Sequence, residues 1–250
     1  MSSDKYLQDI LKKYEVNVGG AQAAANSIYP VISQWGGEYL KSAEFSGSLA
    51  KGTAVSNGAD ADVFLSLSST TPNTLKEIYD SLHSKMTAAG YNARRQNVSI
   101  GLQVNGYSID LVPGKRQSQF GNDHSLYRSK ADSWTKTNVA THISHISNSG
   151  RTDEIRVLKI WRNQRSLDIP SFLLELAVID GLKFARRGNL AENVWNALDF
   201  LAKNIQTKRY VDPANTNNVI SDDCSSQDKA LVAAKAAESR NKRTWEEIVW

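Results

Sequence analysis

The chain has one cysteine, Cys224, among its 250 residues. A lone cysteine excludes an internal disulfide and a zinc site built on cysteines. Long apolar stretches are also missing, because no run approaches the roughly 20 residues that a membrane-spanning helix needs. The polar start of the chain, Met1–Lys5, does not have the pattern of a signal peptide. We therefore expect a cytoplasmic protein with no membrane partner.

An excess of charge of one sign is nearly absent as well. The chain has 30 lysine and arginine residues against 26 aspartate and glutamate residues, which gives a net charge of +4. This balance suits polyanionic ligands, but a solvated and mildly basic surface would give the same value. With 40% hydrophobic and 22% charged residues, the composition is that of an ordinary globular protein with a sizeable core.

What the chain does have is three aspartates in strand-like surroundings. Asp60 and Asp62 flank one residue, and the alternating stretch Val63–Leu67 follows them. Because residues two apart in a strand point to the same side, both carboxylates leave on the face opposite the apolar residues. Asp110 lies on the return strand of a hairpin whose turn is the Asn-Gly pair at 105–106. If that hairpin joins the first strand in one sheet, the three carboxylates meet on one surface.

Three converging carboxylates repel one another unless a hard cation lies among them. Oxygen ligands suit Mg²⁺, and two such ions a few ångströms apart are the usual arrangement for displacement at a phosphorus centre. The pattern therefore predicts a site for two Mg²⁺ ions, with Mn²⁺ as a substitute, held by Asp60, Asp62 and Asp110.

A glycine–serine pair precedes the aspartates in the sequence. Gly47 lets the backbone approach a ligand closely, Ser48 can donate to a phosphate oxygen, and Lys51 adds a cation nearby. Taken alone, such a pair also fits an ordinary turn. Its combination with the aspartates is far more specific and predicts a phosphate-binding turn.

Hydrophobic periodicity predicts an α+β fold that changes character along the chain. Helices are expected at about 20–36 and 72–89, and a polar loop at about 115–133. Beyond this loop the pattern is helical, at about 137–149, 152–166, 171–187, 190–204 and 226–240. We therefore expect a small mixed β-sheet with flanking helices in residues 1–134 and a helical domain in residues 135–250.

Three further positions each have two interpretations. Lys159 lies on a polar face of the helix expected at 152–166, and such a face is usually a solvent-exposed basic surface. Ser171 begins the next helix, where it fits an N-cap residue. His142 is followed by a second histidine three residues later, but no third nitrogen or sulfur ligand for a metal lies nearby.

The glycine–serine turn, the Asp-x-Asp strand and the later aspartate resemble the nucleotidyltransferase superfamily that includes DNA polymerase β. Arg156–Glu175 resembles the helical segment of oligoadenylate synthases, bacterial cyclic-oligonucleotide synthases and archaeal-type CCA-adding enzymes. Asp212–Val219 resembles a segment found late in the same group, and Ala233–Ile248 resembles their terminal helix.

This resemblance implies a polymerase β-like catalytic domain and a helical domain that closes the nucleotide cleft. In that family the three aspartates hold two Mg²⁺ ions and a nucleoside triphosphate, and the counterpart of Lys159 contacts the triphosphate. Ser171 matches a serine that some relatives use for the same phosphates. His142 falls where CCA-adding enzymes carry a histidine, although the sequence around it differs. Asp110 is in addition a candidate general base for the acceptor hydroxyl.

The function that follows is template-independent, metal-dependent nucleotidyl transfer from nucleoside triphosphates. The expected product is a short oligonucleotide or cyclic nucleotide signal, as in bacterial defence. One alternative is nucleotide addition to an RNA 3′ end, as in CCA-adding enzymes, and another is an inactive module that senses nucleotides. The expected partners are nucleoside triphosphates, with RNA or an activating ligand as alternatives.

Overall fold

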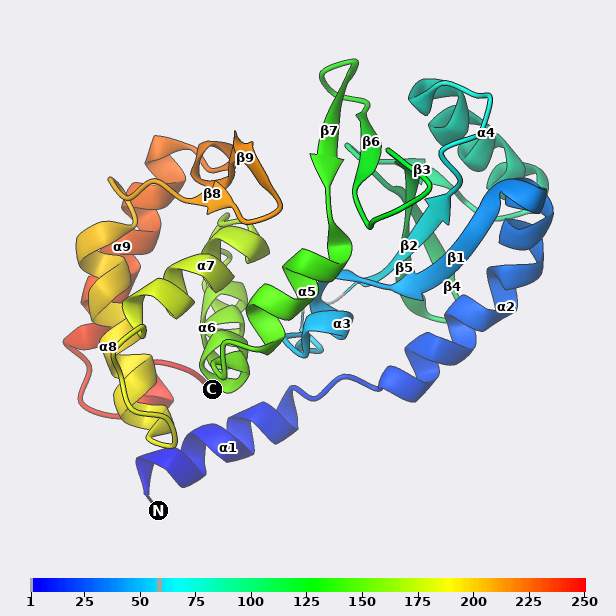
Figure 1. Cartoon of the computed structure of the whole chain (residues 1–250). Helices are drawn as coiled ribbons and strands as arrows, with labels where there is room; N and C mark the ends of the chain where they lie inside the picture. Colours follow the sequence, from blue (N-terminus) through cyan, green and yellow to red (C-terminus); the bar gives the residue numbers. More distant parts are fainter. Residues whose placement is uncertain (1, 58–59) are drawn as a thin grey trace. The chain divides into compact units, whose positions relative to one another are not determined.

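The computed structural model describes residues 2–57 and 60–250 (Figure 1). The chain divides into two compact units. One of them, called here the sheet unit, consists of Asn17–Lys51 and Ala59–Ile143. The other, called the helical unit, consists of Met1–Val16, Gly52–Gly58 and Ser144–Trp250.

The sheet unit is built on a sheet that has seven strands in the described residues. These are β1 (Leu40–Phe45), β2 (Ala61–Leu67), β3 (Arg94–Arg95), β4 (Ile100–Val104), β5 (Tyr107–Arg116), β6 (His124–Arg128) and β7 (Ser133–Thr137). Five strands follow the order β1-β2-β5-β4-β3, and β6 and β7 continue from β5. β2 and β5 run parallel to each other, whereas β2 is antiparallel to β1 and β5 is antiparallel to β4 and β6. The two strands that carry the aspartates are therefore direct neighbours.

Alternation along β2 and β5 gives the sheet two different faces. Val63, Leu65 and Ile109 are buried in one apolar cluster with residues of helices α2 (Val18–Gly36) and α4 (Leu75–Ala88). These two helices cover that face, as Figure 1 shows. The opposite face carries Asp62 and Asp110. The sheet unit also contains η1 (Gly37–Tyr39) and α3 (Gly47–Lys51), and α5 (Val139–Ser147) follows β7.

The helical unit packs around one buried helix, α6 (Thr152–Gln164). Trp161 of α6 is fully buried, and its indole N–H donates to Ser239 Oγ at 2.9 Å. The other helices are α1 (Ser3–Lys13), α7 (Ser171–Gly181), α8 (Leu190–Asn204) and α9 (Ser226–Arg240). Between α8 and α9 lie the hairpin β8 (Val211–Asp212) and β9 (Asn215–Val219) and the short helix η2 (Ile220–Asp223), and η3 (Trp245–Glu247) follows α9.

Several expected elements are confirmed. The turn at 105–106 has positive φ at both Asn105 (51°) and Gly106 (84°), as a two-residue hairpin turn of this kind requires. Helices α2, α4 and α9 lie where the periodicity placed them. The polar loop expected at about 115–133 is wrong, because β6 lies within it. β6 buries only His124 and Leu126, so its alternation is carried by few apolar residues.

The compact units also differ from a division at residue 134. The boundary after the sheet falls between Ile143 and Ser144, and α1 belongs to the helical unit although it opens the chain. Leu7, Ile10 and Leu11 of α1 are buried in the helical unit's apolar cluster, which explains this assignment. Across residues 2–57 and 60–250, no helix is both long and apolar enough to span a membrane.

Candidate active site

Two of the three predicted aspartates lie side by side on the sheet. Asp62 of β2 and Asp110 of β5 are register partners in the parallel pair. Neighbouring strands are about 4.8 Å apart, and register partners point to the same face. Their neighbours in the chain, Val63 and Ile109, point to the buried face. The strand alternation therefore brings two carboxylates together on the polar face, as the sequence predicted.

The glycine–serine turn packs directly on the first carboxylate. The Ser46 N–H donates to the Asp62 carbonyl at 2.8 Å, which ties the end of β1 to β2. Gly47 has a φ of +54°, and a Cβ placed there would lie 1.7 Å from Asp62 Oδ2. Only glycine allows both this backbone conformation and this approach. The five-residue helix α3 begins at Gly47 and carries Ser48 and Lys51.

Asp110 is oriented by two side chains from the segment before β4. Gln96 Nε2 donates to Asp110 Oδ1 at 2.9 Å, and Ser99 Oγ donates to Asp110 Oδ2 at 3.4 Å. Burial raises the pKa of Asp110, and the charge of Asp60 raises it further, whereas the two hydrogen bonds lower it. Asp60 itself is exposed and lies just before β2. The charge of Asp60 thus acts on the carboxylate of Asp110.

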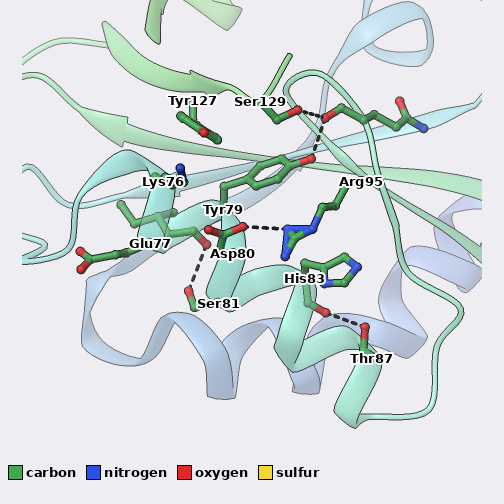
Figure 2. Close-up of polar contacts among 12 residues, drawn as sticks. Lys76, Glu77, Tyr79, Asp80, Ser81, His83, Thr87, Arg95, Tyr127 and Ser129 are labelled. Carbon is green, nitrogen blue, oxygen red and sulfur yellow. Dashed lines mark hydrogen bonds and ion pairs between the residues drawn. The ribbon is translucent and has the colours of Figure 1, made fainter. Parts of the chain in front are cut away.

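A buried tyrosine fixes the segment that holds Asp110. The hydroxyl of Tyr79 in α4 donates to the Gln96 carbonyl at 2.6 Å, and Ser129 Oγ donates to the same oxygen at 2.7 Å (Figure 2). Gln96 and Ser99 were missed by the sequence reasoning, because neither belongs to a motif and both act through hydrogen bonds across the sheet. Tyr79 was expected only as a buried residue of its helix, but its hydroxyl also holds the backbone of Gln96 in place.

The donors at this site suit a hard divalent cation. Within the described ranges 2–57 and 60–250, no group of three or more histidine, cysteine, aspartate or glutamate side chains is arranged to hold a metal ion, so the donors available are the two adjacent carboxylates. The carboxylate of Asp62 lies against Gly47, and that of Asp110 is held by Gln96 and Ser99. Two adjacent carboxylates, with a third raising the pKa of one of them, are a donor set that Mg²⁺ prefers. The residues present therefore fit the predicted metal.

A cavity of about 160 Å³ opens beside Asp62 in the sheet unit. It is lined by Ser46, Gly47, Lys51, Asp62, Phe64, Val112, Leu126, Thr137, Val139, His142 and Ile143. Four residues predicted from the sequence, Gly47, Lys51, Asp62 and His142, thus share one cavity. His142 therefore lines the same cavity as Gly47 and Lys51 of the predicted phosphate-binding turn.

Lys159 does not lie on an exposed basic face, so that interpretation is wrong, and its contact with a triphosphate stays a prediction. Its side chain is buried, with Nζ 2.6 Å from Glu175 Oε1 of α7 and 3.0 Å from Thr53 Oγ1. Thr53 Oγ1 also donates to Glu175 Oε1 at 2.7 Å. The polar spacing on α6 does not mark a solvent face, because this helix is enclosed by the rest of the helical unit.

Ser171 is not an N-cap residue either. It is the first residue of α7, whose N-cap position is occupied by Pro170, and no side chain caps this helix. The exposed Ser171 hydroxyl accepts a hydrogen bond from Arg162 Nη1 at 2.9 Å. The capping interpretation is therefore wrong, and a phosphate contact at Ser171 stays a prediction.

No family model and no curated protein matches the sequence, but many solved structures match the fold. CdnC of E. coli MS115-1, in its complex with HORMA-deltaN, has a TM-score of 0.75 at 19% identity, over 95% of this chain and 89% of that chain. The Bradyrhizobium diazoefficiens CD-NTase CdnG, in complex with GTP, has a TM-score of 0.77 at 14% identity, over 96% and 93%. The Elizabethkingia meningoseptica cyclic dinucleotide synthase CdnE, with GTP and Apcpp, has a TM-score of 0.69 at 15% identity, over 97% and 100%. The chain thus has the fold of these proteins, which confirms at the level of the fold the α+β class and the resemblance to nucleotidyltransferases.

Proposed function

We propose that this chain, which folds like the bacterial CD-NTases, is a metal-dependent nucleotidyltransferase that joins nucleoside triphosphates into a short oligonucleotide or cyclic nucleotide. One observation carries the proposal. Asp62 and Asp110 are register partners on parallel strands, and the glycine turn is packed on the first of them beside a cavity. A carboxylate pair next to a glycine turn and a cavity is the arrangement that phosphoryl chemistry needs.

Asp60, Asp62 and Asp110 would hold two Mg²⁺ ions. When bound, these ions would neutralise the triphosphate and make the acceptor hydroxyl more acidic. Gly47, Ser48 and Lys51 would bind the phosphates at the cavity, with His142 as a further contact. For Lys159 and Ser171, a phosphate contact is suggested by the resemblance alone.

The chain's own groups can be assigned to the steps of the transfer. Gln96 and Ser99 keep the Asp110 carboxylate in one orientation, in which it can accept the proton of the acceptor hydroxyl. The acceptor oxygen bonds to the α-phosphorus, its proton passes to Asp110, and the bond to the bridging oxygen breaks to release pyrophosphate. Lys51, at the end of α3, is the cation of the cavity closest in sequence to the glycine turn and would stabilise charge on the phosphates.

A pyrophosphate-release assay with each nucleoside triphosphate and Mg²⁺ or Mn²⁺ tests the proposal. Asp62→Ala should lower the rate by several orders of magnitude, because it removes a metal ligand. Asp80→Ala is the matched control, since it removes a carboxylate of the same unit that is 44% exposed and forms a surface salt bridge with Arg95. Release that is absent with every nucleotide, or unchanged in Asp62→Ala, would refute the proposed activity.

The product is identified by mass spectrometry of reactions with nucleotides alone and with tRNA added. Products formed without RNA support a signal synthase, which would act in defence against phage. Strict dependence on tRNA would instead favour addition to RNA 3′ ends. Nucleotide binding without any turnover would favour a sensing module.

A further inference from the structure

A second cavity, of about 180 Å³, opens on the same face of the sheet. It shares Phe64, Val139 and Ile143 with the cavity at Asp62, so the two are neighbours within the sheet unit. Its polar lining comes from Ser42, Glu44, Ser66, Arg116, Asn122 and His124. The binding of a triphosphate at the glycine turn uses none of these polar side chains.

Strand geometry gives the distance between this cavity and the aspartates. Asp62, Phe64 and Ser66 alternate onto one face of β2, and a strand rises about 3.3 Å per residue. Phe64 therefore lies about 7 Å along the strand from Asp62, and Ser66 about 13 Å. A nucleoside whose ribose hydroxyl lies at the carboxylates can place its base over Phe64 and reach the second cavity.

A line of hydrogen bonds forms the floor of the cavity. His124 Nδ1 lies 2.9 Å from the Asn122 carbonyl, which can only accept, so Nδ1 carries the proton. His124 Nε2 then accepts from Ser66 Oγ at 2.8 Å, and Ser66 Oγ accepts from Arg116 Nε at 3.1 Å. Burial lowers the pKa of His124, which favours this neutral form. Ser66 and His124 are both buried, so the direction of each hydrogen bond is fixed before a ligand arrives.

The cavity presents two charged groups to a ligand: the guanidinium of Arg116 as a donor of paired hydrogen bonds and the carboxylate of Glu44 as an acceptor. Arg116 uses Nε for Ser66, and within the described residues this is its only hydrogen bond, so its terminal nitrogens are available. Glu44 of β1 lines the same cavity with an exposed carboxylate, which accepts hydrogen bonds only. An arginine fork matches two adjacent acceptors, a carboxylate matches adjacent donors, and Phe64 offers an apolar surface to an aromatic ring.

We propose that this cavity binds the guanine base of the acceptor nucleotide, with Arg116 on O6 and N7 and Glu44 on the N1–H and the 2-amino group. Guanine presents these two acceptors and these donors together. Adenine has an amino donor where guanine has O6 and an acceptor where guanine has N1–H, so it mismatches both side chains. The inference rests on the proposed function for the identity of the ligand, but base binding can be measured without catalysis.

The first experiment is isothermal titration of the full chain with GMP, IMP and AMP in EDTA, where turnover is impossible. Wild type should bind GMP about fivefold or more tightly than AMP, because a bidentate contact discriminates bases by about fivefold to 100-fold. Glu44→Gln should lose the preference for GMP over IMP, which lacks the 2-amino group. Arg116→Lys should weaken GMP about tenfold and leave AMP unchanged, because lysine lacks the fork.

Lys41→Met is the matched control, because Lys41 is an exposed residue of the same strand as Glu44 that does not line the cavity. Its guanine preference should equal that of wild type. Thermal melting of each variant checks the fold, and Glu44→Gln keeps the test decisive if Arg116→Lys unfolds. Equal affinity of wild type for GMP and AMP, or an unchanged preference in both variants, would overturn the proposal.

A turnover experiment separates this inference from the proposed function. If wild type prefers GMP in binding but releases no pyrophosphate from any nucleotide mixture, the base site stands and the proposed activity fails. If wild type makes products from ATP alone and neither binds GMP preferentially nor incorporates guanosine, the activity stands and the base site is refuted.

Discussion

Replacing Lys159 with methionine tests whether this lysine stabilises the helical unit from within. Its ammonium group lies 2.6 Å from Glu175 Oε1, and the side chains of Lys159 and Glu175 are 3% and 1% exposed. Thr53 Oγ1 donates to the same carboxylate oxygen, so the pair has a third polar contact. Methionine keeps much of the apolar stem of lysine but removes its charge. Glu175 would then be a buried carboxylate that has lost its lysine partner and keeps its contact with Thr53 and the influence of the Arg162 charge.

The expected cost follows from burial rather than from the attraction between the charges. Removing one partner of a buried ion pair typically destabilises a protein by about 3–5 kcal/mol, because the remaining charge is desolvated and uncompensated. Replacing both partners with apolar residues of similar volume is often neutral or stabilising. We therefore expect Lys159→Met and Glu175→Leu each to destabilise the helical unit by about 3 kcal/mol or more. The double variant should be more stable than either single one.

Hydrogen–deuterium exchange of peptides from α6 and α7 in increasing urea measures this effect. These peptides report on the helical unit alone, which matters because two compact units can unfold separately. Lys5→Met is the control. Lys5 pairs with Asp9 in the same unit, but the two side chains are 50% and 41% exposed, so the loss should stay below about 1 kcal/mol. A Lys159→Met protein as stable as the Lys5→Met protein would refute the reasoning.

Three further predictions concern the sheet unit. Gly47→Ala should lower the rate of pyrophosphate release about 100-fold, because the added Cβ would displace the carboxylate of Asp62, and small displacements of a reacting group have effects of this size. Gly106→Ala is the control for backbone strain alone, because Gly106 has a φ of +84° and open space around it. Gln96→Ala should weaken Mn²⁺ binding, measured by electron paramagnetic resonance, and should lower kcat about 10-fold or more, because Gln96 orients the carboxylate of Asp110. Gln103→Ala, at an exposed position of β4, should change neither quantity. Because the folded-state pKa of His124 is lowered from 6.5, the neutral ring stabilises the fold above that pH, so the melting temperature should fall as the pH drops below about 6.5 and His124→Gln should lose this dependence.

The part of the site that the sequence predicted depends on the local alternation of apolar and polar residues along single strands. Asp62 was placed on a strand face from the residues around it, and the parallel pairing of β2 with β5 brings Asp110 to the same register. Gly47 was expected to allow a close approach, and the structure shows that the approaching group is the carboxylate of Asp62. The alternation of side chains along a strand and the positive φ of a glycine both depend on a few neighbouring residues, so both can be predicted from the sequence.

The parts that the sequence missed depend on contacts between distant segments. Gln96 orients Asp110 from 14 positions away, and Tyr79 fixes Gln96 from a helix on the other face of the sheet. The sequence around Gln96 is that of an ordinary polar segment, and the sequence around Tyr79 is that of an ordinary buried helix position. The cavity that Arg116 and Glu44 line also requires the strands β1, β2, β5 and β6 to be in register before it exists.

Lys159 shows most clearly why a pattern on one helix cannot decide the environment of a side chain. Lysine, arginine and asparagine at helical spacing are typical of a solvated face, since a buried ammonium group is costly. That cost is offset here by Glu175, which is 16 positions away on the next helix, and by Thr53, which is 106 positions away. The sequence contains all three residues, but only the packing of α6 against α7 brings the opposite charges together. A lysine in such a pair is an internal part of the helical unit, so any phosphate contact it makes has to compete with Glu175 for the same ammonium group.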